Sequence, residues 1–210
     1  MAKSKNKMNP KAKEERNPVL RLDLGDPTYG ALSSYARRIG KLLAAPPVRK
    51  NPDLAGSYDD FLGAVYALIQ AKKHDFADRT GPIEIAAVEK RAQMIATGKV
   101  RTDGKWVAGF YFNNALYRTA AVQHRILKII TKKNDVQVPK LRKEAKSLFS
   151  QWTSDKLDMV HSEVNDLKHT PSGVHDQRTV TYQDAVAAVG ELLTLIELWT
   201  AANIPSTPKP

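Results

Sequence analysis

The fold is decided by residues 155–199, which read DKLDMVHSEVNDLKHTPSGVHDQRTVTYQDAVAAVGELLTLIELW. Apolar residues within and just before the first half of this stretch recur at three- and four-residue steps, the period of a helix with one buried face. The members of this apolar row are Ala145, Leu148, Trp152, Met159, Val160, Val164 and Leu167. The spacing predicts one long helix over residues 139–169.

A second helix is expected after a short loop. A proline and a glycine at positions 171 and 173 end the first helix, because neither residue type favours a helix interior. Thr181 followed by Asp184 is typical of a capping box, in which the side chain of each residue accepts the backbone N–H of the other. An apolar periodic run follows at once. The pattern therefore predicts a helix over residues 182–203.

A polar row lies beside the apolar row of the first helix. Asp158, His161, Asn165 and His169 are separated by three, four and four residues, so their side chains share one flank of the helix. We interpret His161 as a structural residue that is hydrogen-bonded to Asp158. His169 lies near the helix C-terminus, where the helix dipole favours a protonated imidazole.

The two helices and their loop resemble the HEPN superfamily of small all-α domains. The resemblance covers roughly residues 100–203 and rests on an Asn-x-x-x-His sequence at a helix C-terminus, a loop and a DAxxAVxxLLxLIxL helix. The catalytic motif of the superfamily has an arginine, a polar residue and then a histidine. In the VNDLKH sequence of this chain, Asn165 and His169 match that motif and Val164 stands at the arginine position.

The resemblance implies an RNA-directed protein, specifically a metal-independent endoribonuclease of a toxin–antitoxin or antiviral defence system. It also implies a homodimer, no cofactor, and a protein partner such as an antitoxin. In that role His169 would be the catalytic acid or base, and Asn165 would orient a phosphate or a 2′-hydroxyl. Arg178 or Arg118 would replace the missing cation that stabilises charge on phosphorus.

Two other functions stay open. The first is a noncatalytic HEPN-like module that binds RNA or a partner protein. In that case Val164, in place of the family arginine, reflects the loss of catalytic activity. The second is a basic structural protein whose tail binds packaged nucleic acid.

Composition limits the domain organisation and the class of partner. The 210 residues, 42% of them hydrophobic, suit a single helical domain over residues 18–204. Residues 1–17 carry six Lys or Arg against two Glu and predict a disordered basic tail, and residues 205–210 form a proline-rich C-terminal tail. A net charge of +11 favours polyanions, either nucleic acid such as RNA or an anionic membrane surface.

The residue types also exclude some chemistry. The chain has no cysteine, which excludes disulfides, cysteine nucleophiles and cysteine zinc ligands. It shows no signal peptide and no uninterrupted apolar run of about 18 residues, so we expect a soluble, cytoplasmic protein with no membrane partner. A phosphate-binding glycine loop and a nucleophile elbow are absent. His161 and His169 are about 12 Å apart along a helix, too far to share one metal ion. We predict neither metal nor cofactor.

The remaining helices are predicted from start and stop signals. They are a helix capped by Asp26 that runs from Pro27 to Leu43, a helix capped by Ser57, and a helix from Pro82 to Gly98. The VRTDGKW sequence at 100–106 predicts either a small hairpin or a turn. With long helices at 106–133, 139–169 and 182–203, these elements predict an all-α up-and-down bundle of five or six helices.

The helix predicted over 106–133 is basic. No Asp or Glu occurs between Asp103 and Asp135. We name the basic ridge from four cations that fall close to one line along this helix: Arg118, Arg125, Lys128 and Lys132. Such a ridge is able to follow RNA phosphates. The alternative is a solvated face whose charges pair with acids from neighbouring helices.

Two further features belong to the same part of the chain. Lys140, Arg142, Lys143 and Lys146 begin the next helix and would extend the basic ridge. Arg118 and His124 match the loose spacing of the HEPN motif and are weaker catalytic candidates. They lie about 120° apart around a helix, so a partner subunit would have to complete that site.

Overall fold

The computed structural model describes residues 27–74, 76, 85–98, 104–169 and 179–204, and every regular element in them is an α-helix. In chain order the helices are α2 (Pro27–Leu43), α3 (Pro46–Arg49), α4 (Pro52–Lys73), α5 (Ile85–Ala96), α6 (Gly104–Thr131), α7 (Val138–Leu148), α8 (Asp155–His169) and α9 (Tyr182–Asn203). The all-α prediction is confirmed. The predicted tails at 1–17 and 205–210, and most of the possible hairpin at 100–106, lie outside the described residues.

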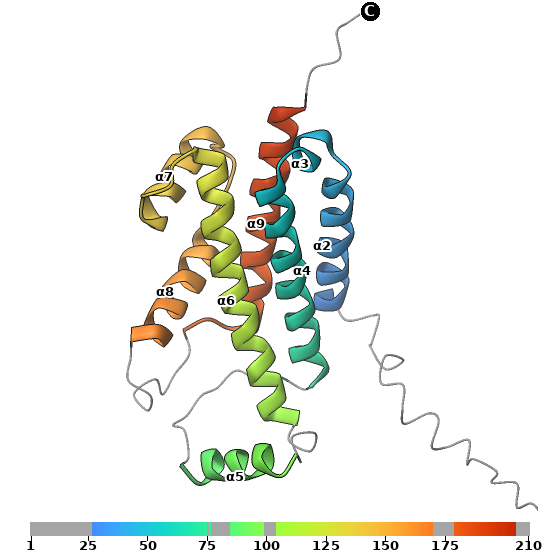
Figure 1. Cartoon of the computed structure of the whole chain (residues 1–210), viewed down its shortest axis with the longest axis vertical. Helices are drawn as coiled ribbons and strands as arrows, with labels where there is room; N and C mark the ends of the chain where they lie inside the picture. The colour runs from blue at the N-terminus through green and yellow to red at the C-terminus, as the bar shows by residue number, and fades with distance from the viewer. Residues whose placement is uncertain (1–26, 75, 77–84, 99–103, 170–178, 205–210) are drawn as a thin grey trace, which may run out of the picture.

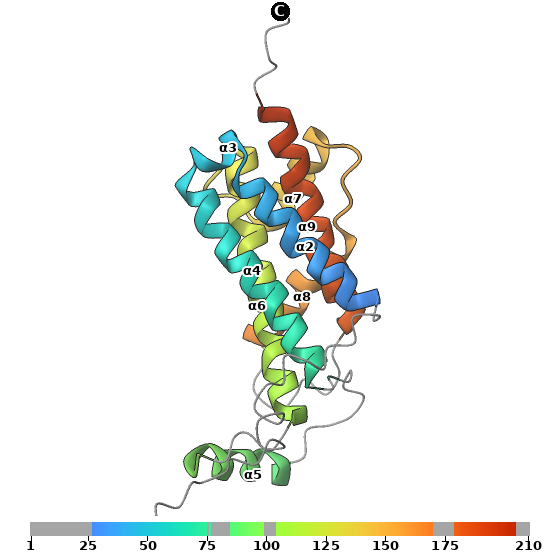
Figure 2. The ribbon, with the colours of Figure 1, turned by 90° about the vertical axis from the view of Figure 1, so that its right-hand side faces the viewer.

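The five long helices α2, α4, α6, α8 and α9 run alternately up and down, as an up-and-down bundle requires (Figure 1). Helix α4 packs along α6, α2 packs on α4 and α9, and α8 packs on α6 and α9. Figure 2 shows the same layers from the side, with α5 lying across one end of the bundle. Helix α6 therefore lies between α4 on one side and α7 and α8 on the other.

Helix α9 is the apolar centre of the bundle. Its capping box is present: Thr181 Oγ1 accepts the N–H of Asp184 at 3.2 Å, and Asp184 Oδ2 accepts the N–H of Thr181 at 3.1 Å. The Tyr182 hydroxyl donates to the carbonyl of Leu68 at 2.6 Å and ties α9 to α4. Among the helices in the described part of the chain, only α9 is long and apolar enough to cross a membrane by length and composition. Half of that apolar window is buried inside the protein.

The prediction of one helix over 139–169 is wrong, because α7 and α8 are separate helices. Between them Trp152 turns into the core, 3% exposed, and its indole N–H donates to the carbonyl of Glu191 at 2.8 Å. The Glu191 carboxylate then accepts the N–H groups of Lys156 at 3.1 Å and Leu157 at 3.0 Å. Those N–H groups belong to the first turn of a new helix, so a residue of α9 caps the start of α8.

Two helix ends test the remaining start and stop signals. The prediction that Ser57 caps a helix is wrong: α4 begins earlier, at Pro52, and Asn51 Oδ1 accepts the N–H of Leu54 at 3.1 Å. Ser57 lies inside the helix and donates to the carbonyl of the residue four positions before it. The prediction that Gly98 ends a helix is confirmed, since it follows α5 with a φ of +67°, a conformation that glycine adopts without strain.

Candidate functional site

An open cleft of about 680 Å³ lies between α6, α8 and the connection from α6 to α7. Helix α6 contributes His124 and Lys128 to its lining, and α8 contributes His161, Asn165 and Lys168. The bundle therefore brings two imidazoles from separate helices into one cleft, together with two ammonium groups, three side-chain amides and the carboxylate of Asp135. We call this the α6–α8 cleft.

The side chains of His161 and Asn165 are in direct contact, with His161 Nε2 and Asn165 Nδ2 3.1 Å apart. The amide nitrogen donates and Nε2 accepts, which fits a neutral ring that carries its proton on Nδ1. The predicted hydrogen bond from His161 to Asp158 is wrong, because the Asp158 carboxylate forms an ion pair with Arg142 instead. In the polar row of α8, Asp158 thus pairs with the buried Arg142, whereas His161 and Asn165 line the cleft.

Both imidazoles of the cleft favour the neutral form. The pKa of His161 is lowered from 6.5, first by burial and then by the positive charge of Arg142. The pKa of His124 is lowered from 6.5 as well, first by burial and then by the nearby Lys128. A neutral imidazole accepts a proton at its unprotonated nitrogen, so His124 is suited to act as a general base near neutral pH. His161 can do the same when the Asn165 amide releases its Nε2.

Arg142 is part of the protein interior rather than the surface. It is 8% exposed, and its guanidinium pairs with Asp158 across the interface between α7 and α8. The prediction that Arg142 extends the basic ridge is therefore wrong. Its neighbours Lys140 and Lys143 are exposed on the same helix.

The basic ridge divides into two pairs. Arg118 Nη1 donates to Asp60 Oδ1 at 3.0 Å, Arg118 Nε donates to Asn114 Oδ1 at 2.8 Å, and Arg125 forms an ion pair with the same Asp60 of α4. Arg118 also lies over Gly63 of α4, where a side chain would collide with its guanidinium. These two cations are engaged within the protein, as the alternative interpretation of the ridge expected.

The other half of the basic ridge is not engaged in this way. Lys128 and Lys132 form no ion pair with any acidic residue that the structure describes. Lys128 points to the α6–α8 cleft, which it lines. These two residues are the cations of the ridge that an external phosphate would meet.

The structure places the catalytic candidates in different regions. Asn165 and His124 line the α6–α8 cleft, whereas Arg118 is held by α4 and does not line it. His169 is the last residue of α8, and its side chain lies outside the described residues, as does all of Arg178. Val164, at the position of the family arginine, is 2% exposed and belongs to the core.

Sequence reasoning missed His161 and Lys168 as members of a site. The four-residue spacing between His161 and Asn165 was visible in the sequence and would have indicated their contact. Their proximity to His124 depends on how α6 packs against α8, which no local pattern records.

Comparisons with known proteins identify no relative of this chain. No family model matches the sequence, and no curated protein or solved structure matches it.

Within the described ranges, no three His, Asp or Glu side chains are grouped so that they could hold a metal ion.

Proposed function

We propose that this chain is a HEPN-like, RNA-directed protein that holds a phosphodiester in the α6–α8 cleft and cleaves the RNA backbone there. One observation carries the proposal: two imidazoles, His124 and His161, face a single open cleft from separate helices. The Lys128 and Lys168 ammonium groups in the same cleft would attract the phosphate. Asn165 would hold the His161 ring in one tautomer.

The proposed chemistry is general acid–base catalysis in which one ring is the base and the other ring is the acid. One neutral imidazole would take the proton of the RNA 2′-hydroxyl, and the 2′-oxygen would then form a bond to phosphorus. The bond from phosphorus to the 5′-oxygen would break, and the other imidazole, in its protonated form, would give its proton to that leaving oxygen. Lys128 or Lys168 would stabilise the charge on the phosphate oxygens. Because both pKa values lie below 6.5, turnover should peak below pH 6.5, where one ring is protonated.

A second function is favoured by Val164. Its burial in the core means that the family arginine has no counterpart at that position. A noncatalytic module that uses the same cleft to bind RNA would need only the lysines and the amide. The homodimer and the antitoxin partner implied by the family resemblance stay predictions.

The decisive experiment measures cleavage of a single-stranded RNA by the wild type and by His124→Ala, His161→Ala and His169→Ala. We expect each of the first two variants to lose about 10²- to 10⁴-fold in rate, the usual contribution of general acid–base catalysis. His74→Ala is the matched control, because His74 stacks on Tyr111 at 5.9 Å and does not line the cleft. No step of the scheme uses a metal ion, so activity should survive a chelator.

The outcomes separate the possible roles. If the rate falls only in His169→Ala, catalysis takes place at the end of α8 and not at the histidine pair. If the wild type binds RNA and leaves it intact under all conditions, the noncatalytic module is the better description.

A further inference from the structure

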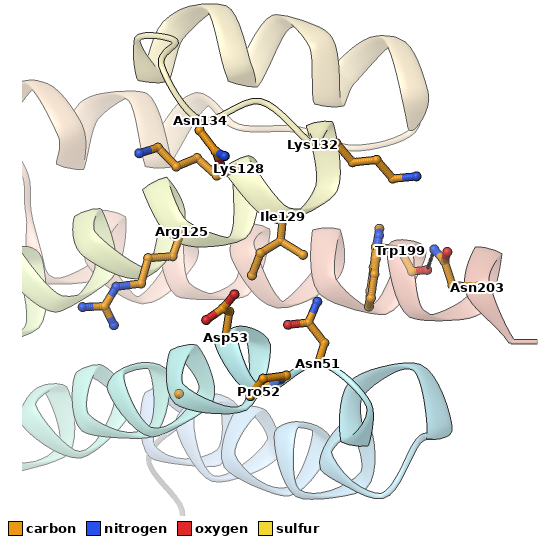
Figure 3. Close-up of a pocket in the computed structure, with 11 residues that line it drawn as sticks. Asn51, Pro52, Asp53, Arg125, Lys128, Ile129, Lys132, Asn134, Trp199 and Asn203 are labelled. Atoms are coloured by element: carbon orange, nitrogen blue, oxygen red, sulfur yellow. Dashed lines mark hydrogen bonds between the residues drawn. The ribbon is translucent and has the colours of Figure 1, made fainter.

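A second hollow lies next to the α6–α8 cleft. It has a volume of about 790 Å³ and is bounded by the start of α4 and the C-terminal ends of α6 and α9 (Figure 3). Lys128 and Asn134 line both this hollow and the α6–α8 cleft, so the two cavities adjoin. A single ligand long enough to pass Lys128 would occupy both. We call this cavity the Trp199 hollow.

The walls of the Trp199 hollow combine an aromatic face with amides. Trp199 is half-buried and projects into the hollow from α9, and Asn51 projects into it from the start of α4 (Figure 3). Asn51 uses its side-chain oxygen to accept the N–H of Leu54, so its amide N–H groups are left to meet a ligand. Asn203 lies beside the indole and donates to the backbone carbonyl of Trp199 at 2.8 Å. An aromatic face beside amide donors is suited to an unpaired nucleobase, which stacks on one surface and hydrogen-bonds at its edge.

The charges of the Trp199 hollow favour an anion. Lys128 and Lys132 line it and have no acidic partner among the described residues, and Asp53 supplies one carboxylate to the lining. Arg125 also lines the hollow, although Asp60 engages its guanidinium. The net unpaired charge of the lining is therefore positive, and Lys128 lies where the hollow meets the α6–α8 cleft.

Lys132 occupies a backbone position that glycine would favour. Its φ of +58° is left-handed, and this conformation costs a residue with a side chain roughly 1–2 kcal/mol. Lys132 comes directly after the last residue of α6, where glycine is the usual residue for ending a helix. A lysine held there at a cost in stability indicates that the position is used for its side chain.

We propose that the Trp199 hollow is a nucleotide subsite for single-stranded RNA. An unpaired base stacks on Trp199, and the adjoining phosphates contact Lys128 and Lys132. The strand then continues past Lys128 into the α6–α8 cleft, where its next phosphodiester reaches the histidines. This subsite deepens the proposed function and rests on RNA being the ligand.

The test compares two probes whose binding depends on different contacts. A fluorescein-labelled short single-stranded RNA has bases and phosphates, whereas inorganic polyphosphate has phosphates alone. Trp199→Leu should weaken RNA binding by roughly 5- to 150-fold, the range given by one lost stacking contact, and should leave polyphosphate binding unchanged. Trp199→Phe is the matched control that keeps an aromatic face, and it should retain most of the RNA affinity.

Lys132→Gly distinguishes a loss of ligand contacts from a loss of folding. Glycine relieves the left-handed backbone, so this variant should melt at or above the wild-type temperature while it binds both probes more weakly. A Trp199→Leu protein that binds RNA as tightly as the wild type overturns the subsite. So does a Trp199→Leu protein whose affinities for RNA and polyphosphate fall equally.

The subsite and the catalytic proposal fail in different ways. Trp199-dependent binding without cleavage supports the subsite and contradicts catalysis at the histidines. Cleavage with normal binding in Trp199→Leu contradicts the subsite alone. If the wild type binds neither RNA nor polyphosphate, both proposals fail.

Discussion

The His161 imidazole is kept neutral by its position between the core and a buried cation. Burial removes the ring from water, and Arg142 repels an added proton. Asp158 opposes this effect, but its carboxylate is already paired with Arg142. His124 and Lys168 add further positive potential when they are protonated. Protonation of His161 is therefore coupled to the stability of the fold.

The sign of this coupling gives a prediction for acid stability. The folded-state pKa of His161 is lowered, so the unfolded chain binds the proton more readily. The contribution of His161 to stability is full above pH 6.5 and is lost as the pH falls through the lower, folded-state pKa. As the pH is lowered through that window, the melting temperature measured by circular dichroism should fall less in His161→Gln than in the wild type. His74→Gln is the control, and equal acid sensitivity in the wild type and His161→Gln would contradict the coupling.

At the scale of single residues, the sequence predicted some members of the site and not their partners. Asn165 was found because it belongs to a motif, and His124 because it follows Arg118 at a family spacing. The partner assigned to His161 was wrong, because Arg142 comes from α7 and takes the Asp158 carboxylate. Arg142 itself was expected at the surface. Each error concerns a contact between helices, which residue spacing within one helix does not specify.

At the scale of helices, starts and stops were predictable where the signal is local. The Thr181 capping box and Gly98 are both local signals, and both were predicted correctly. Ser57 is also a common capping residue, but Asn51 followed by proline begins α4 first. The break between α7 and α8 has a different origin, since Glu191 of α9 supplies the acceptors for the first turn of α8. A pattern confined to residues 139–169 does not predict that interaction, because the acceptor belongs to α9.

Glu191 should therefore stabilise α8 from outside the helix. Burial raises the pKa of its carboxyl group, and the backbone N–H groups of Leu157 and Lys156 oppose that rise. Glu191→Ala leaves those N–H groups without their acceptor and should lower the free energy of unfolding by about 1–3 kcal/mol. Glu191→Gln keeps one acceptor oxygen and should lose less. Urea unfolding followed by circular dichroism measures both variants.

The control for this prediction is Glu144→Ala, which removes a helical glutamate that forms a surface ion pair and caps none of the described helices. Glu144 pairs with the exposed Lys133 at 2.8 Å, and such a surface pair contributes only about 0–1 kcal/mol. A loss in Glu191→Ala no larger than the loss in Glu144→Ala would mean that the carboxylate does not stabilise the start of α8.

At the scale of the whole molecule, the net charge of +11 does not show which cations are accessible to a polyanion. Asp60 engages two cations of the basic ridge, Arg118 and Arg125, and the interior engages Arg142. Of the four ridge cations, Lys128 and Lys132 therefore keep a charge that is unpaired within the described part of the chain. Both line the Trp199 hollow, and Lys128 also lines the α6–α8 cleft. The sequence predicted the all-α bundle and the basic ridge, but it did not show which ridge cations the fold had already paired.

The salt dependence of RNA binding distinguishes the two pairs of ridge cations. Each phosphate contact with single-stranded RNA contributes a slope of about 0.7 in log affinity against log salt. The double variant Lys128→Ala and Lys132→Ala should therefore lower the slope by about 1.4. Arg118→Gln with Arg125→Gln is the matched double variant. It should leave the slope nearly unchanged and reduce the melting temperature instead, because Asp60 loses both partners. If the arginine variant lowers the slope as much as the lysine variant, the guanidinium groups leave Asp60 for RNA phosphates, and the whole ridge is the binding surface.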